Sequence, residues 1–168
     1  MADMLRPRPE YILFVRIHLM EVDELPDNSP NAEVEEYEDW GVGLRDLAPP
    51  KGLRRWIIFD ESTIVGNMSA HPVSYGPNEG SVSMNIGISV RREFRGLGIG
   101  SAAQKILAEI LHSAGYVRIE AGTDVGNLAE QKALSKAGFQ FEGILRAAQV
   151  RRSGRHDLQL WSHVSQEN

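Results

Sequence analysis

The chain contains no cysteine, and this absence excludes several kinds of chemistry. Without a thiol the protein can form no disulfide framework, no cysteine-ligated metal site and no covalent acyl-cysteine intermediate. A long apolar run is missing as well. The longest one near the start, residues 11–15, is broken by Arg16 and His18 and is too short for a membrane span or a signal-peptide core. We therefore expect a cytoplasmic protein with no membrane partner.

An excess of basic residues is also missing, because 18 Lys and Arg stand against 23 Asp and Glu and leave a net charge of −5. No basic stripe with interleaved aromatic residues occurs, which argues against nucleic acid as a partner. Acidic residues gather in residues 21–44, a segment without Lys or Arg. This acidic segment has two interpretations. It either attracts a cationic acceptor through its field or forms a solvated surface.

The length suits one catalytic domain covering residues 1–168, which can bury roughly 70% of the surface of the unfolded chain. Apolar periodicity predicts strands over residues 11–20, 55–59, 64–71, 82–90, 116–121, 139–145 and 156–164, and helices over 31–47, 99–114 and 128–137. Helices are inserted between strands. We therefore predict an α/β (α+β) fold with a mixed, mostly antiparallel central sheet flanked by helices on both faces.

The most informative motif is a glycine-rich turn between the predicted strand 82–90 and the predicted helix 99–114. It consists of Arg95, Gly96, Leu97, Gly98, Ile99, Gly100 and Ser101. Glycines let main-chain N–H groups approach an anion closely, and the helix that follows adds the partial positive charge of its N-terminus. The turn therefore predicts a pyrophosphate site.

Two common phosphate motifs are less consistent with this turn. A Rossmann fingerprint would place G-x-G-x-x-G directly after a buried parallel strand, whereas here the preceding strand alternates and five residues separate its end at Val90 from Gly96. A Walker A loop would need Gly-Lys-Ser/Thr, which does not occur. Dinucleotide binding remains a remote alternative.

A second stretch lies at a matching distance from the turn. Asn127 is followed by Lys136-Ala137-Gly138-Phe139 and then by Glu142-Gly143, with Asp157 near the end. Together the two motifs resemble the acetyl-CoA-binding core of the GNAT N-acetyltransferase superfamily. The spacing is similar to that of the ribosomal-protein alanine N-acetyltransferases. The resemblance covers residues 56–164, about two-thirds of the chain.

The resemblance implies how acetyl-CoA is held as a co-substrate. Main-chain groups of Ile88, Ser89 and Val90 would pair with the pantetheine like an added strand, and the N–H groups of residues 95–101 would meet the pyrophosphate. The Asn127 side chain would contact CoA. The residues themselves offer a second role, since Asn127 is a good helix N-cap and Glu130 stands where a capping-box acid reaches back.

The reaction implied is direct attack of an amine on the thioester in a ternary complex, without a metal. In this family a glutamate is frequent where this chain has Asn85, a serine where it has Glu130, and a tyrosine where it has Leu134. The candidate catalytic residues are therefore Asn85, which would hold a bridging water, and Glu130. Ser135 and Tyr116 are alternative proton donors, although structural roles are more common for both.

Two functions follow from these motifs. The first is an N-acetyltransferase that moves the acetyl group of acetyl-CoA to a primary amine, on either a small molecule or a protein N-terminus. The alternative is an acyl-CoA-binding protein with weak or no transferase activity, because both customary proton-handling positions differ. Tyr75, in the turn-rich stretch after residue 71, is a candidate for the acceptor pocket. The sequence leaves open whether the protein forms a homodimer.

Overall fold

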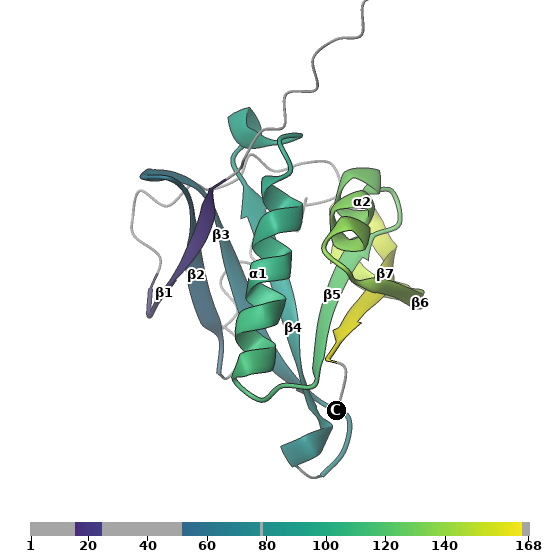
Figure 1. Cartoon of the computed structure of the whole chain (residues 1–168). Coiled ribbons are helices and arrows are strands. Elements are labelled where there is room, and N and C mark those ends of the chain that lie inside the picture. The colour runs from purple at the N-terminus through teal and green to yellow at the C-terminus, as the bar shows by residue number, and fades with distance from the viewer. Residues whose placement is uncertain (1–15, 25–51, 78, 166–168) are drawn as a thin grey trace, which may run out of the picture.

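The computed structural model describes residues 16–24, 52–77 and 79–165 as a sheet with helices (Figure 1). The strands are β1 (Ile17–Val22), β2 (Arg54–Asp60), β3 (Thr63–Ser74), β4 (Val82–Val90), β5 (Arg118–Asp124), β6 (Gln140–Arg151) and β7 (Gly154–Val164). The helices are α1 (Ile99–Ser113) and α2 (Leu128–Lys136), with short 3-10 turns at Glu79–Ser81 and Arg92–Phe94. The seven strands lie in the order β1-β2-β3-β4-β5-β7-β6, and β4 and β5 are the parallel pair. The predicted mixed, mostly antiparallel sheet is confirmed.

Most predicted elements are present close to their predicted bounds. Strand β4 has the predicted limits, and α1 ends just before Gly115, whose φ of +95° favours glycine. The predicted start of β5 at residue 116 is wrong, because Tyr116 lies in the turn that follows α1, where its N–H donates to the Leu111 carbonyl oxygen. The part of the first predicted strand before residue 16 and the helices predicted over 31–47 lie outside the described residues.

Strand β6 extends further than the predicted 139–145, and its second half is irregular. Its register with β7 shifts between Leu145 and Gln149, and Ala147 has a φ of +55°. Asp157 on β7 stabilises this bulge, since its Oδ1 accepts a hydrogen bond from the Ala147 N–H at 2.7 Å. The extension was not predictable from alternation because β6 is largely exposed on both sides.

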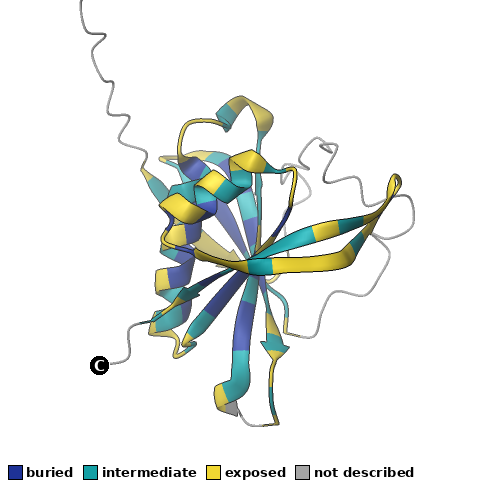
Figure 2. Ribbon diagram, turned by 90° about the vertical axis from the view of Figure 1, so that its right-hand side faces the viewer, coloured by how far each residue is buried: buried dark blue, intermediate teal, exposed yellow. Residues whose placement is uncertain are grey.

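Both described helices lie on the same side of the sheet (Figure 2). Met84 and Ile86 of β4 pack in one core cluster with Ala103 and Leu107 of α1 and with Leu134 of α2. Each large apolar side chain buried in this way contributes about 1.5–3 kcal/mol. The alternation of β4 then requires Asn85, Gly87 and Ser89 to face the opposite side of the sheet.

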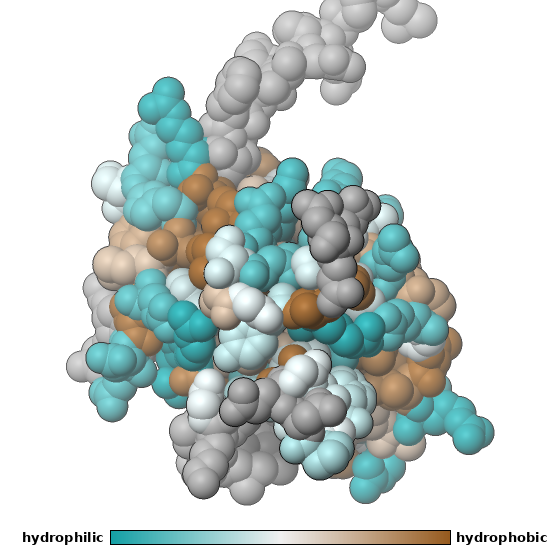
Figure 3. Space-filling view, turned by 60° about the horizontal axis from the view of Figure 1, so that its bottom comes forward, coloured by the Kyte–Doolittle hydropathy of each residue, from teal (hydrophilic) through white to brown (hydrophobic). Residues whose placement is uncertain are grey.

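The surface outside this core is mixed in character. The face shown in Figure 3 carries separate hydrophobic patches among hydrophilic ones, as is usual for folded domains. In the described ranges we found no helix with the length and apolarity needed to cross a membrane.

The pairing of β4 with β5 is short, and this positions the site. Within the described residues the two strands are in register only where Met84–Ile86 faces Ile119–Ala121. Beyond this point β4 continues to Val90 and β5 continues to Asp124 without pairing to each other. Over residues 87–90 the edge of β4 that faces β5 is therefore unpaired by any strand and available for another chain or ligand, except that the Val90 carbonyl oxygen accepts a hydrogen bond from Arg95.

Candidate active site

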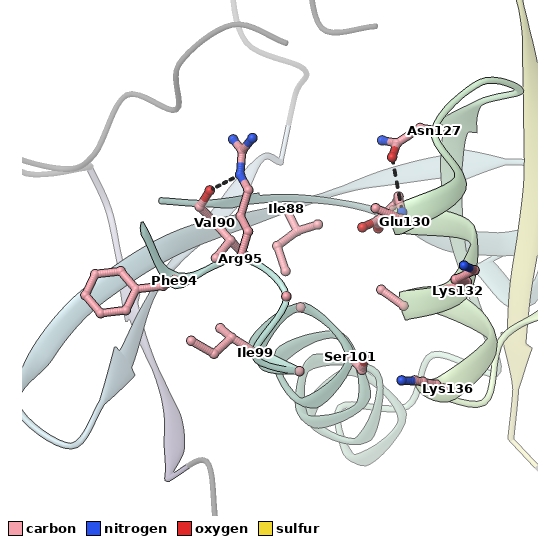
Figure 4. Close-up of a pocket in the computed structure, with 15 residues that line it drawn as sticks. Ile88, Val90, Phe94, Arg95, Ile99, Ser101, Asn127, Glu130, Lys132 and Lys136 are labelled. Atoms are coloured by element: carbon pink, nitrogen blue, oxygen red, sulfur yellow. Dashed lines mark hydrogen bonds between the residues drawn. The ribbon is translucent and has the colours of Figure 1, made fainter. Parts of the chain in front are cut away.

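A cavity of about 310 Å³ opens between the end of β4, the glycine-rich turn, the start of α1 and one face of α2 (Figure 4). Its lining includes most of the residues predicted from sequence. These are Ile88, Val90, Arg95, Gly96, Gly98, Ile99, Gly100, Ser101, Asn127 and Glu130. The structure thus gathers three separate segments of the chain around one space.

The backbone of the turn explains why glycines stand there. Gly96 and Gly98 have φ values of +76° and +84°, which side chains other than glycine adopt at a cost. Gly98 is also the N-cap of α1 and carries no side chain to satisfy the first N–H groups of the helix. The start of α1 therefore presents main-chain donors beside the cavity, an arrangement that suits an anion.

Three cationic side chains line the same cavity. Arg95 is fixed by a hydrogen bond of 2.9 Å from its Nε to the Val90 carbonyl oxygen. Lys132 and Lys136 approach from α2, across the cavity from Arg95 (Figure 4). Sequence analysis missed both lysines as site residues. Their spacing of four residues on one helix was the available signal, because such residues share a helix face.

Asn127 has the capping role predicted for it. Its Oδ1 accepts a hydrogen bond of 3.1 Å from the Glu130 N–H, and its own N–H donates to the Asp124 carbonyl oxygen at 2.9 Å. The side chains of Asn127 and Glu130 also line the cavity. The cap fixes the start of α2, and with it the positions of Lys132 and Lys136.

Three predicted residues do not line the cavity. Leu97 is exposed in the turn, and Ser89 alternates away from Ile88 and Val90. Asn85 lies on the sheet face opposite α1, so the structure does not bring it together with Glu130. The two candidate catalytic residues thus occupy separate parts of the molecule.

Asn85 belongs instead to a row of polar residues that crosses the sheet. His71 of β3 is opposite Asn85, Asn85 is opposite Glu120 of β5, and Glu120 is opposite Ser162 of β7. We call these four residues the polar row. Glu120 is the carboxylate of the row, and its side chain is only 2% exposed. Sequence analysis missed it, because nothing local distinguishes one acid in a strand.

Glu120 is buried but well supplied with hydrogen-bond donors. Its Oε2 accepts from the Tyr75 hydroxyl at 2.9 Å, and its Oε1 accepts from Arg118 Nε at 2.6 Å. Burial, together with this bond to Glu120, raises the pKa of Tyr75. The phenol therefore stays protonated and serves as a donor to the carboxylate.

Arg118 also holds a second carboxylate. Its two terminal nitrogens bind both oxygens of Glu142 at 2.7 and 2.5 Å, and the Ser162 hydroxyl donates to Glu142 Oε1 at 2.5 Å. These hydrogen bonds, those from Arg118 first, lower the pKa of Glu142 to about 2. Glu120, Arg118 and Glu142 together carry a formal charge of −1.

Comparison with known families decides the class of protein. The model of the acetyltransferase (GNAT) domain matches residues 11–140. The chain belongs to the GNAT acetyltransferase family. This confirms the resemblance seen in the motifs and makes the chain an acetyl-CoA-dependent N-acetyltransferase by class. The match favours this class over the remote dinucleotide-binding alternative.

Solved structures of several acetyltransferases have a similar fold. The ribosomal-protein-alanine N-acetyltransferase from Brucella melitensis is 25% identical, with a TM-score of 0.59 over 68% of this chain and 70% of that one. RimJ from Mycobacterium smegmatis, in complex with CoA-disulfide, is 24% identical, with a TM-score of 0.59 over 67% of this chain and 53% of its own. The ribosomal-protein-S5-alanine acetyltransferase from Vibrio fischeri is 23% identical, with a TM-score of 0.60 over 68% and 63%. No curated protein sequence matches this GNAT chain.

Proposed function

We propose that this GNAT domain transfers the acetyl group of acetyl-CoA to a primary amine by direct attack in a ternary complex. The observation that carries the proposal is the cavity, which combines the start of α1, the free edge of β4 and three cations. The diphosphate of CoA is anionic and suits the start of α1 and the three cations. Its pantetheine is rich in amides and suits the free edge of β4.

The proposed cofactor position uses the residues expected from sequence together with the two lysines. The main-chain donors of residues 95–101 bind the pyrophosphate, and Lys132 and Lys136 neutralise further phosphate charge. The main chain of Ile88, Ser89 and Val90 pairs with the pantetheine arm along the unpaired edge of β4. Asn127 offers its amide to the same ligand.

The chemistry requires a neutral amine, because an ammonium group has no lone pair for attack. As the acetyl carbon becomes tetrahedral, its oxygen gains negative charge that main-chain N–H groups near residues 88–90 stabilise. Leu134 is fully buried in the core and has no proton to give to the departing sulfur. The thiolate therefore takes its proton from another group or from water.

Two classes of acceptor fit this proposal. A protein N-terminus is favoured by the likeness to the Brucella ribosomal-protein-alanine enzyme, and a small amine is the other class. A second candidate function is acyl-CoA binding without transfer. Asn85 and Leu134 favour it, because neither side chain can handle a proton.

Calorimetry and product analysis test these proposals in order. We expect acetyl-CoA and CoA to bind the protein, and NAD and ATP to bind far more weakly. Release of CoA is then measured with peptides that begin with alanine or serine and with a set of small primary amines. Acetylated product identified by mass spectrometry supports the transferase. Tight acetyl-CoA binding with no product from any amine supports the binding protein instead.

A further inference from the structure

We infer that Glu120 is the proton acceptor for the amine substrate, and that Tyr75 positions its carboxylate. This inference rests on the proposed function and names a residue of that same site. Its starting point is the place of Glu120 in the sheet, directly beside Asn85 and one residue before the last β4-β5 pair, Ile86 with Ala121.

The position of Glu120 matters because β4 and β5 separate just after it. A ligand that enters the cavity and follows the free edge of β4 inward reaches the point where Ile86 pairs with Ala121. Asn85 and Glu120 precede these two residues and point to the face opposite α1. The carboxylate of Glu120 therefore lies where the gap between β4 and β5 closes, on the side of the sheet away from the phosphate-binding groups.

The region around Glu120 differs from the cavity in its charge. The cavity contains Arg95, Lys132 and Lys136 beside the acid Glu130. The cluster around Glu120 instead contains two carboxylates and one guanidinium, with Tyr75 bonded to Glu120 and with His71 beyond Asn85 on β3. Asp124, further along β5, is paired with Arg151 and His156. A protonated amine is repelled by the first region and attracted by the second.

The Glu120 carboxylate has hydrogen-bonding capacity left for such a donor. Among the described residues, Tyr75 and Arg118 are its hydrogen-bond donors, and they occupy one position on each oxygen. An ionised carboxylate offers about four lone-pair positions, so each oxygen can accept once more. Asn85 is neutral and cannot take a proton, but its amide can orient the amine beside Glu120.

The proton and electron movements balance as follows. A protonated acceptor gives one proton to the Glu120 carboxylate, and the freed nitrogen lone pair forms the N–C bond to the acetyl carbon. The C–S bond then breaks, and the second proton lost by nitrogen goes to the departing CoA sulfur. Glu120 returns its proton to water. The products are the amide, the CoA thiol and one proton.

The test compares Glu120→Gln with Glu142→Gln in the full chain, using acetyl-CoA and the acceptor that the wild type acetylates best. Both substitutions remove one carboxylate from Arg118, but only the first removes the carboxylate next to Asn85. We expect Glu120→Gln to lower kcat/KM for the acceptor by about 100-fold or more, with calorimetric acetyl-CoA affinity unchanged. Glu142→Gln should lower it by less than about tenfold, because it leaves the carboxylate next to Asn85 in place.

Two further variants guard against a folding defect in Glu120→Gln. Glu120→Asp keeps the charge and should recover at least about a tenth of wild-type turnover, which mere loss of packing would not allow. Tyr75→Phe removes only the hydroxyl that donates to Glu120 and should lower kcat by about fivefold at unchanged acetyl-CoA affinity, as expected for loss of one positioning hydrogen bond.

The outcomes separate this inference from the proposed function. A wild type that acetylates none of the amines overturns the proposed function and the inference with it. An active wild type with Glu120→Gln within fivefold of it overturns the inference alone. Weakened acetyl-CoA binding in folded Glu120→Gln, or unchanged kcat in Tyr75→Phe, also counts against the assigned roles.

Discussion

Gly98 and Gly100 stand two residues apart in the glycine-rich turn, yet their backbones make different demands. Gly98 has a φ of +84°, so any side chain there strains the turn. Gly100 has helical geometry, and a Cβ added to it would lie 3.8 Å from the Ala133 Cβ, an ordinary contact. Only Gly100 therefore allows a side chain to be placed beside the cavity without distorting the backbone.

We predict that Gly100→Asp lowers acetyl-CoA affinity by at least about 100-fold while the protein remains folded. The new carboxylate would occupy the region of the phosphates and repel them, and two units of phosphate charge near one carboxylate make the loss large. Isothermal titration calorimetry measures the affinity, with thermal melts as the check on folding. Gly100→Ala is the matched control and should bind within about tenfold of the wild type. A folded aspartate variant of normal affinity would remove the central claim about the cavity.

At the scale of helices and strands, two pairs of ionisable side chains connect different elements. Arg118 of β5 binds Glu142 of β6 across the intervening β7, and His112 of α1 contacts His163 of β7. Both pairs connect segments far apart in the sequence, and both depend on protonation. Their effects on stability fall in different pH ranges.

The Arg118–Glu142 pair should make stability fall in acid. The pKa of Glu142 is lowered from 4.5 to about 2 by hydrogen bonds from Arg118 and Ser162, so the pair stabilises the fold fully above pH 4.5. This contribution is lost as the pH falls through about 2. Glu142→Gln should therefore flatten the decline in urea-unfolding free energy between pH 5 and 3. Because the Glu142 side chain is 35% exposed, solvent screening keeps the difference small. Parallel pH curves for the two proteins would contradict this account.

The two histidines should act near neutral pH. The His112 Nδ1 lies 2.7 Å from the Tyr116 carbonyl oxygen and must carry a proton, so its Nε2 accepts from His163 Nδ1 at 2.8 Å. Burial, and then the neighbouring His112, lower the pKa of His163 below 6.5. Protonation therefore favours the unfolded chain, and this contribution is present above pH 6.5 and declines below it.

We predict that the melting temperature falls between pH 7.5 and 5.5, and that His163→Gln removes most of this slope. Differential scanning calorimetry at several pH values measures it, and His18→Gln, at an exposed position of β1, serves as the control histidine outside the pair. An unchanged slope in His163→Gln would show that other groups control stability in this range.

For the molecule as a whole, charge is divided between regions. The cavity contains three cations and one acid, the cluster of Glu120, Arg118 and Glu142 has a negative formal charge, and residues 21–44 add acidic charge that lies largely outside the described residues. Under the proposed function, a cofactor with several phosphates and an acceptor with an ammonium group would be attracted to different places.

Glutamine substitutions at five acidic positions test the role of that segment. With Glu33, Glu35, Glu36, Glu38 and Asp39 changed together, we expect a higher KM for a cationic acceptor and almost the same KM for acetyl-CoA. Added salt should weaken acceptor use in the wild type more than in this variant, because screening shortens the range of exposed charges to about 8 Å. Steady-state kinetics at several salt concentrations provide the comparison. Equal salt dependence would make the segment a solvated surface.

The sequence by itself determined the parts of this protein that depend on neighbours along the chain. Turn glycines, the cap Asn127, the alternation of β4 and the periodicity of α1 were predictable, because backbone strain, capping and amphipathicity act over a few residues. Tertiary structure alone decided which strands separate and which residues share a row. Glu120 joins Asn85 through strand register, and Tyr75 reaches Glu120 from 45 residues away. Register is set by packing of the whole sheet, and local patterns do not encode it.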